Sequence, residues 1–220
     1  MIIKSYEINK INFKKNNFFL FYGENEGFKN EAIQTYFEKK YLDKTYRYDE
    51  KEILDNKENF FNSILTKSFF DNEKLIIISR ASDKIKIIIE EILNKNLEDI
   101  KFVISAGILE KKSKLRTLFE KNNKTICIPF YADNHQTLRI LTNNFFKKKN
   151  IPISQQSINI LVERARGDRQ NLNNELNKIE NFTINKKKID IEEILKITNL
   201  SENYNVSELI DSCLIKNSKK

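Results

Sequence analysis

The sequence has little of the residues that break or cross-link a chain. Its 220 residues include only four glycines and two prolines, with two cysteines and no tryptophan. So little glycine and proline excludes collagen-like and low-complexity chains, and it argues against an all-β fold rich in tight turns. The composition favours long helices with few interruptions.

Cysteine and histidine are also scarce. Cys127 and Cys213 lie far apart in the sequence, and His135 is the single histidine. This excludes a disulfide framework and a paired-cysteine metal site, so we expect no metal, a cytoplasmic location and a buried, unreactive Cys127. No apolar stretch reaches the roughly 18 residues that span a bilayer, so we expect no membrane partner.

Charged side chains, by contrast, are abundant. Lysine and arginine number 39 against 31 for aspartate and glutamate, which gives a net charge of +8. A moderate basic excess favours an acidic partner such as nucleic acid. The runs Lys147–Lys149 and Lys186–Lys188 join helical segments, and we interpret them as solvated helix ends or turns.

The first 130 residues alternate short β-branched or aromatic runs with amphipathic segments of helix length. This alternation is typical of βαβ units around a parallel sheet. The third and fourth runs lack polar alternation, as expected for strands covered on both faces. The predicted strands are 18–22, 46–48, 75–78, 102–105 and 125–128, and the predicted helices between them are 28–40, 57–67, 83–95 and 113–122.

After Pro129 the pattern becomes helical throughout. Periodic segments at 135–149, 154–165, 168–182 and 190–198 predict a small all-helical domain, with Ser154 as a helix N-cap. We therefore expect an α/β domain over 1–133, a helical domain over 134–200, and the start of a truncated third domain over 201–220.

One turn nearly matches a phosphate-binding loop, G-x-x-x-x-G-K-[ST]. Counted from Gly23, the second glycine comes one residue early at Gly27, and Asn30 follows Lys29 where a hydroxyl is required. No acid ends the third or fourth strand, where an ATPase places a residue for magnesium. We interpret Gly23, Gly27 and Lys29 as a degenerate phosphate loop in a chain with no cofactor and no catalytic residue.

Two adjacent phenylalanines lie off the apolar stripe of the second predicted helix. At about 100° per residue, Phe69 lies roughly 110° and Phe70 roughly 150° from the centre of the stripe. Either the helix stops early and both rings enter the core, or they project toward a hydrophobic pocket on another protein. The stripe consists of Phe60, Phe61, Ile64 and Leu65.

Four segments together resemble the delta subunits of bacterial DNA polymerase III clamp loaders. These are 19–24, 68–78, 111–118 and 167–180, in that order and spacing. The resemblance implies an α/β, AAA+-like domain, with a parallel five-stranded sheet flanked by helices and followed by a small all-helical lid domain. It also implies a subunit without ATPase activity of its own.

The resemblance further implies partners and a binding site. Ser68, Phe69 and Phe70 match the hydrophobic tip that enters a pocket on the sliding clamp (beta) and helps open the ring. The other implied partners are the clamp-loader subunits tau/gamma and delta prime, with primed DNA reached through the complex. The family's third, collar domain assembles the pentamer, so we expect this chain to be a fragment that binds the clamp without stable assembly.

The resemblance leaves the arginines without a nucleotide role. In the lid element, Gln170 occupies the arginine position of G-D-x-R, and Arg169 comes one residue early. No arginine finger is assigned to Arg116 or Arg139. Near the end of the fourth strand, where parallel sheets present ligands, four basic residues are candidates for contact with the DNA backbone: Lys111, Lys112, Lys114 and Arg116.

Two other functions remain open. A P-loop ATPase or kinase with an atypical loop around Lys29 requires magnesium-dependent ATP binding. A sequence-independent DNA-binding protein requires tight duplex binding with a steep salt dependence.

Overall fold

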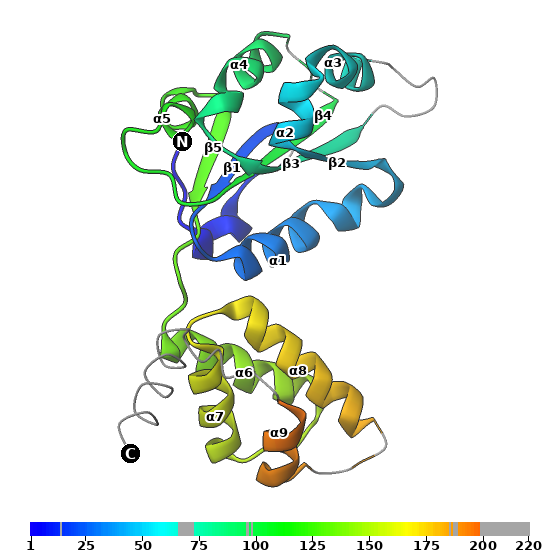
Figure 1. Cartoon of the computed structure of the whole chain (residues 1–220), viewed down its shortest axis with the longest axis vertical. Helices are drawn as coiled ribbons and strands as arrows, with labels where there is room; N and C mark the ends of the chain where they lie inside the picture. Colours follow the sequence, from blue (N-terminus) through cyan, green and yellow to red (C-terminus); the bar gives the residue numbers. More distant parts are fainter. Residues whose placement is uncertain are drawn as a thin grey trace, which may run out of the picture. The chain divides into compact units, whose positions relative to one another are not determined.

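The chain divides into two compact units, Met1–Asp133 and Asn134–Lys220. The first has a sheet covered by helices on both faces, and the described part of the second is helical (Figure 1). The structure is a computed structural model, and it describes residues 1–13, 15–65, 73–95, 97, 99–184, 186 and 189–198.

The sheet of the first unit is parallel throughout, with strand order β2-β3-β4-β1-β5. The central strand β1 lies between β4 and β5, and Leu20 is paired with Ile104 and Cys127. The parallel sheet predicted from the alternating pattern is confirmed. Its strands are β1 (Phe18–Tyr22), β2 (Thr45–Asp49), β3 (Lys74–Ala81), β4 (Ile100–Ala106) and β5 (Thr125–Pro129).

Successive side chains of the central strands enter two different cores. Leu20 and Ile104 face one core, whereas Phe19 and Val103 face the other. Because both faces are covered, these strands have no polar alternation. The first core is closed by α2 (Glu50–Asp55), α3 (Lys57–Leu65), α4 (Lys86–Asn94) and α5 (Lys114–Lys121), and the second by α1 (Glu26–Tyr36) and the 3-10 helix η1 (Ser5–Lys10) (Figure 1).

Capping side chains explain where two of these helices begin. Helix α1 starts at Glu26, two residues before the predicted start, because the Asn25 side chain accepts a hydrogen bond from the Phe28 N–H (3.0 Å). The short helix α2 was not predicted. A capping box between Asp49 and Glu52 stabilises its start. The helix has only six residues, which are too few to show a clear helical periodicity in the sequence.

The apolar stripe of α3 is narrower than expected. Phe60 and Ile64 are buried at 3% exposure each, whereas Leu65 is 41% exposed. The predicted stripe can bury against the sheet through Phe60 and Ile64, but its member Leu65 is exposed. Leu65 is the last residue of α3.

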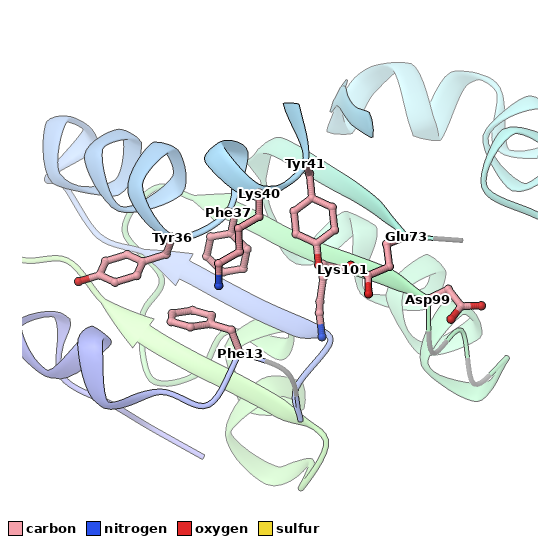
Figure 2. A pocket seen from close by; sticks show the side chains of 8 residues that line it. All are labelled: Phe13, Tyr36, Phe37, Lys40, Tyr41, Glu73, Asp99 and Lys101. Carbon is pink, nitrogen blue, oxygen red and sulfur yellow. The ribbon is translucent and has the colours of Figure 1, made fainter. Parts of the chain in front are cut away.

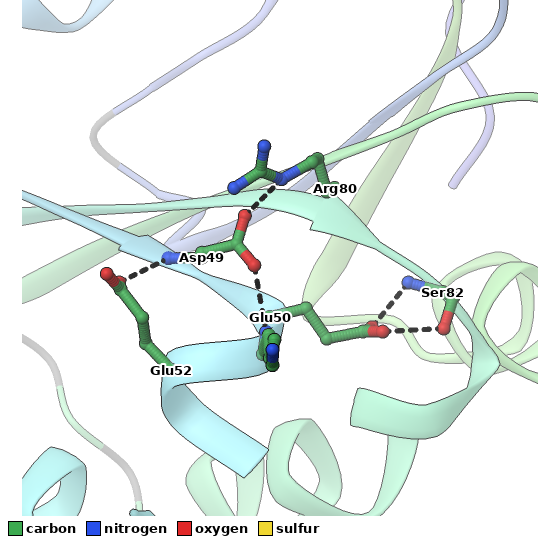
Figure 3. A network of polar contacts seen from close by, with 6 residues as sticks. Asp49, Glu50, Glu52, Arg80 and Ser82 are labelled. Atoms are coloured by element: carbon green, nitrogen blue, oxygen red, sulfur yellow. Dashed lines mark hydrogen bonds and ion pairs between the residues drawn. The ribbon is translucent and has the colours of Figure 1, made fainter. Parts of the chain in front are cut away.

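Strand β3 runs three residues beyond its predicted end at Ile78. A register shift lies between Ile78 and Ala81, and Arg80 has a left-handed backbone (φ 55°). Figure 3 shows the polar network that holds this extension: Arg80 hydrogen-bonds Asp49, and the Glu50 carboxylate accepts from the Ser82 N–H (2.5 Å) and hydroxyl (2.7 Å). The carboxyl ends of β2 and β3 are thus tied together.

An acid does follow β3 once its true end is known. Asp83 accepts hydrogen bonds from the Ser113 hydroxyl (2.6 Å) and the Leu115 N–H (2.9 Å). The Leu115 N–H, followed by the Ser113 hydroxyl, lowers the pKa of the Asp83 carboxyl. This carboxylate therefore fastens the first turn of α5.

We expect Asp83→Ala to lower the free energy of unfolding by about 1 kcal/mol at neutral pH, because the start of α5 loses its acceptor. A lowered pKa stabilises the fold above the unfolded-state pKa of about 3.9, and the effect is lost as the pH falls through the folded-state value. Urea unfolding should therefore show the difference from the parent shrinking below about pH 4. A difference that persists at about pH 2 would contradict this, and Glu110→Ala, which removes a carboxylate paired with exposed Lys112, is the control.

The second unit packs its helices around a core that includes Leu138, Leu161, Leu172 and Ile194. Ser154 accepts the Ser157 N–H (3.0 Å), which confirms the predicted N-cap. The predicted helical segments of this unit are confirmed in the described residues. They are α6 (His135–Lys149), α7 (Gln155–Ala165), α8 (Arg169–Thr183) and α9 (Ile191–Ile197).

Candidate functional site

In the turn after β1, backbone N–H groups donate hydrogen bonds to other parts of the same unit. Gly23 has φ +124°, and a Cβ atom there would lie 2.2 Å from the carbonyl oxygen of Phe130. The Gly23 N–H donates to Gly107 (2.9 Å), and the Asn25 N–H donates to Phe130 (3.2 Å). In a phosphate loop such N–H groups point at the phosphate. Here Gly23 permits a close approach of the chain that leaves β5.

Residues at the start of α1 also form hydrogen bonds with the segment that follows β5. Besides accepting the Phe28 N–H, the Asn25 side chain donates to the Asp133 carboxylate (2.8 Å) and to the Tyr131 carbonyl (3.0 Å). Glu24 accepts the Ala132 N–H (3.2 Å). Residues just after β5 therefore close over the helix end that would otherwise face an anion.

Lys29 is the most unusual residue of this site. Its side chain has no exposed surface, although it comes from the first turns of α1. The ammonium donates to the carbonyls of Gly23 (2.9 Å) and Ala106 (2.6 Å) and to the Glu26 carboxylate (2.5 Å). An ammonium has three N–H bonds, and these acceptors use all of them.

The degenerate loop therefore has a structural task. Lys29 joins the ends of β1 and β4 to α1, and Gly27 is buried within the first turn of that helix. With its three donors engaged, Lys29 has none left for the outer phosphates of a nucleotide.

A basic groove of about 530 Å³ lies between α4 and α5. Lys112 and Lys114, two of the expected DNA contacts, line it, together with Lys86 and Lys121, which sequence reasoning missed. The spacing of Lys114 and Lys121 was the available signal, because residues seven apart lie on one face of a helix. Lys86 comes from another helix, and only the packing of α4 beside α5 brings it here.

The other two expected DNA contacts lie elsewhere. Lys111 is exposed in the loop before α5 but does not line the groove. Arg116 is largely buried: it donates to Glu120 (2.7 Å) and to the Leu109 carbonyl (3.1 Å), and its guanidinium lies 4.9 Å from the centre of the Tyr22 ring. Burial raises the pKa of Tyr22 to about 12. Arg116 thus packs within the unit.

The tip residues Ser68, Phe69 and Phe70 lie outside the described residues. Their connection leaves α3 after Leu65 and reaches β3 at Lys74. Because Lys74 begins a strand of a parallel sheet, the connection ends at the amino edge of the sheet, whereas Gly23 follows β1 at the carboxyl edge.

The lid residues behave as structural groups within the second unit. Arg169 is 5% exposed, whereas Gln170 is exposed and its amide donates to Asn174 (3.4 Å). Asp168 caps α8 by accepting the Asn171 N–H (3.0 Å). Arg169 is therefore buried in its own unit.

Two further features of the described residues concern metal binding and thiol reactivity. No three His, Cys, Asp or Glu side chains gather there in a way that could hold a metal ion, and His135 is exposed at the start of α6. Cys127 is buried as predicted, and burial raises its pKa to about 12, so its thiol stays protonated. Cys213 lies outside the described residues. None of the described helices has both the length and the apolar character needed to cross a bilayer.

Comparisons with known proteins bear on the fold. No protein-family model matches the chain, and a search of curated proteins found no match. Among solved structures, the DNA clamp loader delta protein of Bacillus subtilis is similar with a TM-score of 0.56 at 18% identity. The match covers 97% of this chain, which spans 66% of the delta protein's length.

Two proteins of Thermotoga maritima are similar as well. Domain III of the replication initiation protein DnaA matches with a TM-score of 0.51 at 12% identity, over 88% of each chain. The Holliday junction branch migration motor RuvB matches with a TM-score of 0.53 at 10% identity, over 82% of this chain and 61% of its own. At such identities the likeness concerns the fold alone: a parallel five-stranded sheet flanked by helices, followed by a helical second unit.

Proposed function

We propose that this chain is a clamp-loader delta subunit that binds the sliding clamp and helps open the ring for loading onto primed DNA. The observation that carries the proposal is the burial of Lys29, whose ammonium is used entirely by internal acceptors. An AAA+-like fold whose phosphate-loop lysine is used in this way keeps the architecture of a nucleotide-dependent ATPase. It lacks the lysine donor that would bind the nucleotide's outer phosphates. The similarity in fold to a clamp loader delta protein supports the same reading.

In this function the subunit works by binding. A ligand shifts a conformational equilibrium only by its difference in affinity for the two states, so the tip must bind more tightly to a clamp whose ring interface is weakened. Phe69 and Phe70 supply the apolar surface, and Ser68 precedes them. In the loader, tau/gamma and delta prime are the neighbours of this subunit.

The test is a titration of a sliding clamp with the 220-residue chain, paired with a titration of the chain with magnesium-ATP. We expect saturable clamp binding and no magnesium-dependent ATP binding. Submillimolar, magnesium-dependent ATP binding without clamp binding would instead identify a P-loop ATPase.

The basic groove between α4 and α5 is the proposed contact with DNA phosphates. We expect the double substitution Lys112→Glu, Lys114→Glu to weaken the chain's duplex binding at least tenfold at low salt. The slope of log affinity against log salt should also fall by about 2, because two counterion-releasing contacts are lost. Fluorescence anisotropy of a labelled duplex measures both quantities.

The matched control is Lys147→Glu, Lys148→Glu, which changes the charge equally at exposed positions of α6. Lys114 is the first residue of α5, where an acidic side chain is compatible with the helix dipole, so the test variant should fold. Equal losses in the two variants would mean that net charge, and not this groove, attracts DNA.

A further inference from the structure

A second cavity lies at the amino edge of the sheet, the opposite edge from Gly23 and Lys29. Its volume is about 480 Å³, within the range of small-molecule sites. Figure 2 shows the aromatic and charged side chains that line it, which come from segments that precede β1, β2 and β3 and from the start of β4. The lining includes Phe13, Tyr36, Lys40, Tyr41, Glu73 and Lys101.

The wall of this cavity is a set of packed rings. Phe13 stacks on Tyr36, with ring centres 5.4 Å apart and planes at 20°, and it meets Phe37 edge-on at 5.2 Å. Phe13 is only partly buried, and the Lys40 ammonium lies 5.7 Å from its ring centre. The Phe13 ring is therefore a surface on which a flat ligand ring can stack, and the nearby Lys40 ammonium can pair with an anionic group of the same ligand.

The cavity is lined by two lysines, Lys40 and Lys101, and by two carboxylates, Glu73 and Asp99. The Lys101 ammonium is held by the Asn16 carbonyl (2.8 Å) and the Asn17 side chain (2.5 Å), and burial lowers its pKa. Glu73 is exposed, and its carboxylate oxygens can accept hydrogen bonds. Burial, followed by the charge of Glu73, raises the pKa of Tyr41. The cavity therefore offers a stacking surface on Phe13, a cation on Lys40 and an acceptor on Glu73.

We propose that this cavity binds a nucleotide whose base has an exocyclic amino group, with the base on Phe13, the amino group donating to Glu73 and the phosphate on Lys40. Each part of such a ligand meets a matching group. Carboxylates accept from the cytosine amino group, whereas thymine presents a carbonyl oxygen there and is repelled. The ligand is either a free nucleotide or one nucleotide of a single strand.

This site is separate from the phosphate loop. It lies at the other edge of the sheet from Lys29 and needs no metal. Its occupation should therefore be independent of magnesium, unlike the ATP binding that a P-loop enzyme requires.

The experiment is isothermal titration calorimetry of the 220-residue chain with dCMP and dTMP in the absence of magnesium. We expect a Kd for dCMP below about 1 mM and binding of dTMP at least about threefold weaker. Lys40→Gln should weaken dCMP binding about tenfold, because a charge-assisted contact is lost. A pentameric oligo-dC that binds at least about tenfold more tightly than dCMP identifies a single strand as the natural ligand, and equal affinities identify a free nucleotide.

The controls separate the site from general effects of charge or folding. Lys39→Gln removes an adjacent exposed lysine that does not line the cavity and should leave the Kd unchanged. Phe13→Leu keeps an apolar side chain and should still weaken dCMP binding at least about fivefold, because stacking is lost. No heat of binding up to about 5 mM dCMP, or a Kd unchanged in both Lys40→Gln and Phe13→Leu, would overturn the proposal.

Discussion

Lys29→Met should lower the free energy of unfolding of the first unit by about 3 kcal/mol and its Tm by about 10 °C. Methionine keeps most of the apolar stem but provides no donor. The carbonyls of Gly23 and Ala106, which now accept from a fully buried ammonium, would lose that partner. A buried acceptor without a partner costs about 1 to 3 kcal/mol, and two are affected.

The contribution of Glu26 to this loss is small. Its side chain is 61% exposed, so water solvates its carboxylate once the ammonium is removed. Urea unfolding of the parent, Lys29→Met and Lys39→Met measures the effect, and Lys39→Met is the control because Lys39 is exposed. A Lys29→Met chain of parental stability that has lost magnesium-dependent ATP binding would show that Lys29 serves a nucleotide, and the proposed function would fail with it.

Phe69→Ala, Phe70→Ala should weaken clamp binding at least a hundredfold. A phenylalanine side chain buried in a pocket contributes on the order of 1.5 to 3 kcal/mol, and every 1.4 kcal/mol changes the affinity tenfold. Removing both rings from the centre of an interface therefore costs about 3 kcal/mol or more. Surface plasmon resonance with immobilised clamp measures this as a shift in Kd.

The matched control is Ile108→Ala, which removes an apolar side chain that is 73% exposed at another place in the same unit. Its Kd for the clamp should equal the parent's. Circular dichroism and thermal unfolding of all variants separate lost binding from lost folding. A folded double variant with parental affinity would remove the tip mechanism and leave the buried Lys29 without this functional explanation.

Much of the architecture follows from local patterns. The runs that became β1, β3 and β4 are apolar on both faces, and helical periodicity separates them, so a parallel sheet covered on both sides is the arrangement that buries them. The helical second unit follows from the same periodicity after Pro129. These features depend on side-chain sequence over a few turns, which a linear reading detects.

The sequence-based predictions fail where the structure depends on contacts between residues far apart in the chain. Strand β3 runs past Ile78 because Asp49 and Glu50, some 30 residues earlier, hold Arg80 and Ser82. Helix periodicity placed Leu65 in the buried stripe, but it is exposed at the end of α3. No pattern near these positions records their distant neighbours.

The candidate sites likewise have some features that adjacent residues predict and others that depend on distant contacts. The failed spacing after Gly23 was enough to argue against a working phosphate loop, since it depends on adjacent residues alone. Three other features arise from packing between segments far apart in the chain. Lys29 hydrogen-bonds the Ala106 carbonyl, Lys86 and Lys112 line the same groove, and the Arg116 guanidinium lies beside the Tyr22 ring. Local order follows from neighbouring residues, whereas the availability of a charged group depends on which distant acceptors and rings the fold brings within hydrogen-bonding distance.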